Sequence, residues 1–191
     1  MSLRSEFDSM LPLGKSEVRI SPIGLGAWQW GDRWFWSYGS THQRRDVRQA
    51  FDASRQAGVN WVDTAEVYSN GTSERLLGEF LRQSPGPVVL ATKFMPFPWR
   101  LRRQELLNAL RHSLERIGVP RVDLYQIHQP LPPVAIRTWM QAMAEAHESG
   151  AGARGGRLQL QPEPDAGGGR GVGSAWPPAG LQPGALQPAG A

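Results

Sequence analysis

An aspartate and a tyrosine in one predicted loop are the first residues whose types and spacing could do chemistry. Asp63 follows residues 59–62, a short apolar run that is typical of a buried strand. Tyr68 comes five residues later, and a helix is predicted to begin at Thr72 or Ser73. A carboxylate at a strand end and a phenol in the adjoining loop form an arrangement that is suited to proton transfer.

Two further ionisable side chains lie at equivalent points of the chain. Lys93, one of only two lysines, ends the apolar run 88–93, and His128 follows the apolar run 122–127. The carboxyl ends of parallel strands meet at one face, which is where barrel enzymes place their catalytic groups. We therefore expect Asp63, Lys93 and His128 to meet at one face, close to the tyrosine.

Each of these side chains also has a purely structural interpretation. Asp63 could cap a helix or bind loop backbone, and Tyr68 could be a half-buried loop aromatic. Lys93 could be a surface lysine, and His128 a core histidine with its hydrogen bonds made. Glu66, the nearest other carboxylate, is interpreted as structural. The four histidines lie on separate predicted elements without ligand spacing, so no metal site is predicted.

The elements that must position these residues alternate between strand and helix with a period of about 30 residues. This period favours parallel strands joined by helices, in either a (β/α) barrel or a doubly wound sheet. Thr41 is predicted to cap the first helix. A hairpin is predicted at 11–20, strands at 23–28, 59–62, 88–93 and 122–127, and helices at 43–56, 73–82, 103–117 and from Pro132 to near Gly150.

Aromatic residues are concentrated just before the first predicted helix. Four of the eight tryptophans lie between residues 28 and 36. Such a segment could pack in the core, or it could form an aromatic wall of a ligand pocket. The sequence leaves both interpretations open.

Composition restricts the class of protein. A chain of 191 residues suits one domain with a real core, and the absence of cysteine excludes disulfides and thiolate sites. No window approaches the roughly 18 to 20 apolar residues of a spanning helix. We therefore expect a soluble, cytoplasmic protein without a membrane partner. The net charge of +4 comes from scattered arginines, which favours solvated helix faces over nucleic-acid binding.

The composition changes at about Ala151. Of the 41 residues from 151 to 191, 25 are Gly, Ala or Pro, and such a segment cannot bury enough apolar surface to offset its ordering entropy. We expect two regions, a folded part over 1–150 and a disordered tail over 151–191. One possible coding of residues 158–165, shifted by one nucleotide, reads Ser-Asn-Tyr-Ser-Pro-Asn-Gln. We hypothesise a frameshift near Gly150; a naturally disordered tail is the alternative.

Several motifs together resemble the signature of the aldo-keto reductases. The matching segments lie in the family's order, and the resemblance covers about residues 11–150. It implies a (β/α)8 TIM-type barrel, here with its first four βα units and an N-terminal hairpin, that reduces aldehydes and ketones with NAD(P)H. The segments are Asp63-Thr-Ala-Glu-Val-Tyr68, Ala91-Thr-Lys93, Tyr125-Gln-Ile-His128 and residues 24–31, 70–74 and 113–119.

The resemblance assigns a role to each of the four polar residues. It implies that Tyr68 is the general acid, that Lys93 tunes it, that Asp63 holds the lysine, and that His128 orients the substrate carbonyl. These roles are chemically reasonable. A free tyrosine has a pKa of about 10, and it is a poor proton donor at neutral pH unless a nearby cation stabilises its phenolate. An alkoxide that develops on the substrate also needs a proton and a stabilising dipole.

The resemblance also implies a cofactor site. Gly26, Ala27 and Trp28 match the family's first-strand loop near the nicotinamide, and Asp63 lies beside the ring. NADP(H) is the expected cofactor, with NAD(H) not excluded, and the partner is a small-molecule carbonyl substrate. The family's adenosine contacts come from strands five to eight, so we expect this chain to be impaired or inactive. The alternative is a non-catalytic half-barrel that self-associates through its open edge; the oligomeric state stays open.

Overall fold

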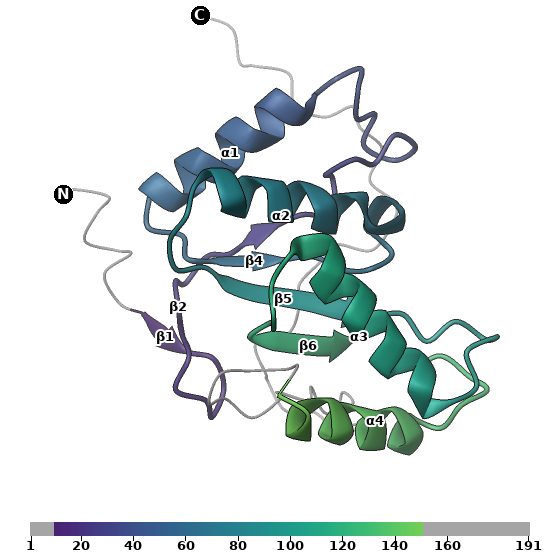
Figure 1. The fold of residues 1–191 in the computed structure, drawn as a ribbon. Coiled ribbons are helices and arrows are strands. Elements are labelled where there is room, and N and C mark those ends of the chain that lie inside the picture. The colour runs from purple at the N-terminus through teal and green to yellow at the C-terminus, as the bar shows by residue number, and fades with distance from the viewer. Residues whose placement is uncertain (1–9, 151–191) are drawn as a thin grey trace, which may run out of the picture. The chain divides into compact units, whose positions relative to one another are not determined.

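The computed structural model of the protein describes residues 10–150, and the predicted tail over 151–191 lies outside the described residues. Two short strands come first, and from β3 onward strands and helices alternate along the described part (Figure 1). Their order is β1 (Leu11–Pro12), β2 (Arg19–Ile20), β3 (Leu25–Gly26), α1 (Arg44–Gln56), β4 (Trp61–Asp63), the 3-10 turn η2 (Tyr68–Gly71), α2 (Thr72–Gln83), β5 (Val89–Phe94), α3 (Arg103–Ile117), β6 (Leu124–Ile127) and α4 (Ile136–Glu148).

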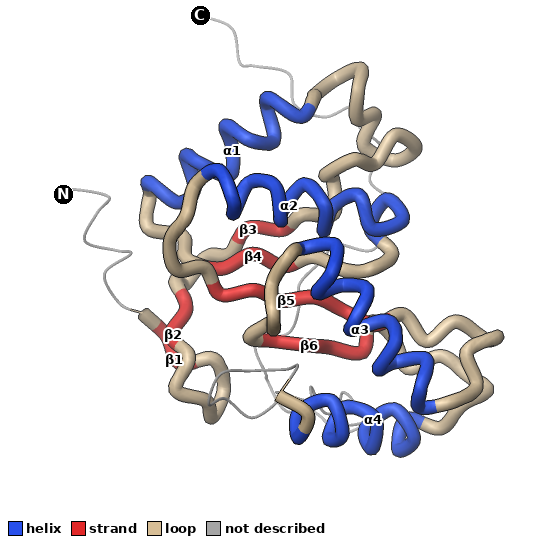
Figure 2. The backbone as a smooth tube through the Cα atoms, in the orientation of Figure 1, coloured by secondary structure: helices blue, strands red, loops and turns tan. Residues whose placement is uncertain are grey.

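Strands β3 to β6 form one parallel sheet in the order β3-β4-β5-β6 (Figure 2). Gly26 pairs with Asp63, Asp63 with Ala91, and Lys93 with Gln126. A doubly wound sheet reverses its strand order at a switch point, whereas this order is strictly sequential. The structure therefore decides between the two predicted arrangements: the described residues form four βα units of a partial barrel.

The helices pack in chain order, each against the next, because each carries one apolar face. Phe51 of α1, Phe80 of α2 and Trp139 of α4 are buried in one core cluster with the strands. Helices α2 and α3 approach closely at Gly78, where a Cβ atom would lie 2.2 Å from the carbonyl oxygen of Ile117. Only glycine allows this contact, so Gly78 lets α2 pack directly against the end of α3.

The N-terminal hairpin is confirmed, with Leu11 opposite Ile20 in an antiparallel pair. Asn60 attaches it to the sheet, since its amide group donates to the carbonyl of Arg19 over 2.9 Å and accepts from the amide of Ser21 over 2.8 Å. No helix among residues 10–150 is long and apolar enough to cross a membrane. The cellular location stays a prediction.

Two predicted helix starts differ from the structure. Thr41 does not cap α1: its hydroxyl donates to the carbonyl oxygens of Trp36 and Ser37, and the Asp46 carboxylate instead accepts the amide of Gln43 over 2.8 Å. Helix α4 begins four residues after the predicted Pro132: residues 132–134 form bends, and the N-cap residue Ala135 has extended backbone. Thr41 was predicted as the cap because threonine is a common N-cap residue and this one lies close to the true start of α1.

Candidate active site

Lys93 is the centre of the polar cluster at the carboxyl ends of the strands. Its Nζ donates to Asp63 Oδ2 over 2.6 Å, to the carbonyl oxygen of Thr64 over 3.0 Å and to Tyr68 Oη over 3.3 Å. The side chains of Lys93 and Asp63 are both mostly shielded from solvent. The ammonium group of Lys93 therefore binds both the Asp63 carboxylate and the Tyr68 phenol. The sequence predicted that these residues lie close together at this face.

The position of Tyr68 depends on the loop between β4 and α2. The amide of Thr64 donates to the carbonyl of Ala91 over 2.9 Å, and the amide of Glu66 donates to the carbonyl of Lys93 over 3.3 Å. The chain then turns sharply, with left-handed backbone at Asn70 (φ 52°) before α2 begins. Because β5 holds the loop at two points, the phenol is directed back to the lysine.

His128 completes the cluster from the loop after β6. Its amide donates to the carbonyl of Phe94 over 2.8 Å, and its ring meets the Tyr68 ring edge-on at 5.6 Å between centroids. Burial lowers the pKa of His128, and the Lys93 cation lowers this pKa further. The imidazole is therefore neutral at pH 7 and can donate one hydrogen bond and accept another.

The lowered pKa of His128 predicts how stability depends on pH. The unfolded chain binds a proton on this ring at a pH of about 6.5, whereas the folded protein binds it only at lower pH. The contribution of His128 is therefore fully present above that value, and the free energy of unfolding falls as the pH decreases toward the lowered pKa. Urea unfolding from pH 5 to 8 should show a smaller acid loss for His128→Gln.

His112 offers the matched control for this measurement, since it is an exposed histidine on α3. His112→Gln should leave the pH dependence of the unfolding free energy unchanged. An identical acid loss in wild-type protein and His128→Gln would contradict the prediction.

Glu66 forms an ion pair, which agrees with the structural interpretation of this residue. Its Oε1 accepts from Arg100 Nη1 over 2.5 Å and from the amide of Met95 over 2.7 Å. The same Arg100 nitrogen donates to the carbonyl of Met95 over 2.9 Å. The pair therefore fastens the loop of Tyr68 to the loop after β5.

A second buried network was not found from the sequence. Glu74 is fully buried; its Oε2 accepts from Arg116 Nε over 2.5 Å and its Oε1 from the Thr92 hydroxyl over 2.7 Å. Nearby, the Ser73 hydroxyl donates to the carbonyl of Ala27 over 2.7 Å. These contacts join the start of α2 to β5, to α3 and to the first-strand loop. The sequence did mark residues 70–74 and 113–119 as matching motif segments, but it did not show that Glu74 and Arg116 meet.

The residues predicted beside the cofactor do lie next to the cluster. The amide of Ala27 donates to the carbonyl of Asp63 over 2.9 Å, and the Trp28 ring lies 6.4 Å from the Tyr68 ring. In the aromatic segment, Trp30 is 2% exposed and belongs to the core, whereas the Trp28 ring faces the polar cluster. That Trp28 forms a wall of a ligand pocket stays a prediction.

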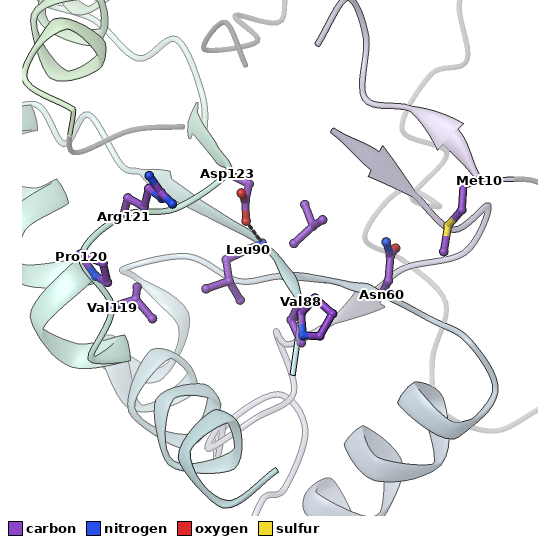
Figure 3. Close-up of a pocket in the computed structure, with 10 residues that line it drawn as sticks. Met10, Asn60, Val88, Leu90, Val119, Pro120, Arg121 and Asp123 are labelled. Atoms are coloured by element: carbon purple, nitrogen blue, oxygen red, sulfur yellow. Dashed lines mark hydrogen bonds between the residues drawn. The ribbon is translucent and has the colours of Figure 1, made fainter. Parts of the chain in front are cut away.

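A pocket of about 520 Å³ lies elsewhere, next to the amino ends of β5 and β6 (Figure 3). Val88, Leu90 and Asp123 are among its lining residues, and the four predicted catalytic residues are not. Asp123 Oδ2 accepts from the amide of Leu90 over 2.9 Å, and burial raises the pKa of the Asp123 carboxyl. Among residues 10–150, no group of three or more His, Asp or Glu could hold a metal ion.

A sequentially ordered parallel sheet with helical crossovers and an Asp-Lys-Tyr-His cluster at its carboxyl ends is the architecture of a partial (β/α) barrel. Comparison with known proteins gives the family. The profile described as the aldo/keto reductase family matches residues 22–153, and the chain belongs to this family.

Two similar relatives show how far the similarity extends. Pyridoxal reductase, chloroplastic, from Arabidopsis thaliana is 40% identical over 121 residues, which are 58% of this chain and 33% of that protein. An uncharacterized oxidoreductase from Mycobacterium tuberculosis is 40% identical over 135 residues, which are 69% of this chain and 40% of that protein. The chain therefore spans less than half the length of these relatives.

Solved structures agree with this assignment. A thermostable aldo-keto reductase in complex with the inhibitor epalrestat matches with a TM-score of 0.67 and 27% identity, over 80% of this chain and 53% of that one. An aldo-keto reductase from Klebsiella pneumoniae in complex with NADPH matches with a TM-score of 0.62 and 25% identity, over 75% of this chain and 46% of that one.

Proposed function

We propose that the site carries out NADP(H)-dependent reduction of a small aldehyde or ketone, or the reverse oxidation of an alcohol. The observation that carries the proposal is the position of Lys93 Nζ, 2.6 Å from Asp63 Oδ2 and 3.3 Å from Tyr68 Oη. A phenol beside an ammonium group is suited to exchange a proton with a carbonyl oxygen.

The first-strand loop fits the reacting end of a nicotinamide cofactor. A Cβ atom built on Gly26 would meet nothing within 4 Å, so there is open space directly beside Asp63. Gly26, Ala27, Trp28 and Asp63 would hold the nicotinamide there. When bound, the reduced cofactor supplies a hydride to the carbonyl carbon. The solved relative bound to NADPH supports NADP(H) as the cofactor.

The four polar residues would divide the remaining chemistry. Tyr68 donates its phenol proton to the carbonyl oxygen, and the adjacent Lys93 cation stabilises the negative charge that is left on the phenol oxygen. Asp63 holds the ammonium group in place through their ion pair. His128, neutral at pH 7, donates a hydrogen bond that orients the carbonyl.

We further propose that the 191-residue chain turns over slowly when assayed alone. Within residues 10–150, β3 and β6 are edge strands of a sheet that does not close on itself. Such edges leave ladder groups unpaired and allow other chains to pair with them. The same edges favour the second candidate function, a non-catalytic half-barrel that self-associates.

The test combines cofactor binding, turnover and size on the full 191-residue chain. We expect NADPH binding by fluorescence titration and slow carbonyl-dependent NADPH oxidation with aldehydes, pyridoxal included because of the relative's name. A compact monomer on size exclusion would accompany this result. A dimer or larger species that neither binds NADPH nor oxidises it would instead support the non-catalytic module.

A further inference from the structure

The pocket next to the amino ends of β5 and β6 lies at the opposite ends of the strands from the polar cluster (Figure 3). Its volume of about 520 Å³ is within the range of small-molecule sites. Most of its lining residues are apolar, among them Val88, Leu90, Val119 and Pro120. The proposed reaction uses none of these residues, so the pocket is open to a ligand of its own.

Two residues of opposite charge line the same pocket, Arg121 and Asp123. They are two positions apart in the segment that leads into β6, and Val122 between them is fully buried in the core. Neighbouring side chains of a strand point to opposite sides. The burial of Val122 therefore agrees with the position of both charged side chains on the other side, along the pocket.

Asp123 is held in place by the neighbouring strand β5. Its amide donates to the carbonyl of Leu90 over 2.9 Å, and its Oδ2 accepts from the amide of Leu90 over 2.9 Å. The other carboxylate oxygen, Oδ1, forms no hydrogen bond with any of residues 10–150. Burial raises the pKa of this carboxyl, because the charged form loses solvation. Asp123 therefore has a fixed position and one oxygen that can accept from a ligand.

The two charges of the pocket are not neutralised by the protein. Within the described part of the chain, neither Arg121 nor Asp123 takes part in an ion pair, with each other or with a third residue. A charge beside apolar surface is costly unless it is paired. A ligand that carries both an ammonium and a carboxylate group would pair with both residues at once.

We propose that this pocket binds a free α-amino acid with an aliphatic side chain, such as leucine. The ammonium group donates to Asp123 Oδ1, and the carboxylate accepts from the Arg121 guanidinium group, whose planar fork matches a carboxylate. The aliphatic side chain is buried against Val88 and Leu90. The four polar residues of the cluster do not line this pocket, so the binding is independent of the proposed reaction.

The test uses three ligands that differ only in their charged groups. L-Leucine carries both groups, 3-methylbutylamine lacks the carboxylate, and 4-methylpentanoate lacks the ammonium group. Their dissociation constants are measured by ligand-observed NMR at pH 7 with the full 191-residue chain. We expect L-leucine to bind about 10-fold more tightly than either analogue, the low end of the range for one hydrogen bond to a charged group.

Two variants should separate the two ends of the ligand. Asp123→Asn keeps an oxygen for the Leu90 amide but loses the charge. It should weaken L-leucine and 3-methylbutylamine about 10-fold and leave 4-methylpentanoate unchanged. Arg121→Gln should weaken L-leucine and 4-methylpentanoate by the same factor and leave 3-methylbutylamine unchanged. If Asp123→Asn does not fold, as judged by circular dichroism, the Arg121→Gln result decides the proposal.

Arg111→Gln is the matched control, since Arg111 lies on α3 with its side chain 63% exposed. It should change none of the three dissociation constants. No measurable binding of L-leucine to the wild-type chain, or losses that are equal for all three ligands, would overturn the site. None of these measurements uses NADPH oxidation, so a failure of this site is distinguishable from a failure of the proposed function.

Discussion

Tyr68→Phe is expected to lower carbonyl-dependent NADPH oxidation at least about 100-fold, the lower limit for loss of a positioned general acid. The substitution removes the hydroxyl that accepts from Lys93 Nζ while keeping the ring that packs against Trp28 and His128. The measurement is NADPH absorbance at 340 nm under single-turnover conditions, with enzyme in excess, because the chain is expected to be slow. NADPH binding should stay unchanged.

Tyr38→Phe is the control for this experiment, since it removes a phenol hydroxyl from a different loop, the one between β3 and α1. The Tyr38 ring packs against His42 and is not in the polar cluster. This variant should oxidise NADPH at the wild-type rate. Equal rates for wild-type protein and Tyr68→Phe would contradict the assignment of the general acid.

Glu74→Ala is expected to lower the free energy of unfolding by about 3–5 kcal/mol, the usual cost of removing one partner of a buried ion pair. The variant leaves the mostly buried Arg116 guanidinium without its carboxylate and the buried Thr92 hydroxyl without its acceptor. Urea unfolding at pH 7 measures the difference.

Glu115→Ala is the matched control, because Glu115 forms an exposed pair with Arg111 over 4.0 Å, with side chains 64% and 63% exposed. Exposed pairs of this kind contribute only about 0–1 kcal/mol. A loss of similar size in both variants would show that the buried network of Glu74 has no special role in stability.

These two effects differ in kind. In the proposed function Tyr68 acts on the reaction, so its substitution should change turnover more than stability. Glu74 contacts Arg116 and Thr92 and none of the four polar residues of the cluster, so its substitution should change stability. A variant of Glu74 that stays folded should therefore retain NADPH oxidation with Tyr68-dependent chemistry. This separation makes the two measurements independent tests of the structure.

Local patterns were enough to predict most elements, because each depends on neighbours in the chain. The apolar run ending at Lys93 is β5 in the structure, and the strand before Asp63 was predicted to end only one residue early. Asp63 belongs to β4 because it pairs with Ala91 on the neighbouring strand. Strand ends depend on such pairing, which the sequence does not show.

Partners that are distant along the chain could not be predicted. Glu74 binds an arginine 42 residues away, Glu66 one 34 residues away, and Ser73 a carbonyl 46 residues away. No periodicity links such pairs, because the choice among many arginines depends on which helix packs beside which strand. The same reason explains why the aromatic segment was left with two interpretations.

The sequence by itself determined that a carboxylate, an ammonium group and an imidazole stand at the ends of apolar runs, with a phenol in the first loop. Only the tertiary structure decided that Lys93 Nζ lies between Asp63 and Tyr68 and that the Trp28 ring lies beside the Tyr68 ring. The physical reason is that side-chain type and strand end are local properties. The distance between two groups depends instead on strand order, register and the packing of helices against the sheet.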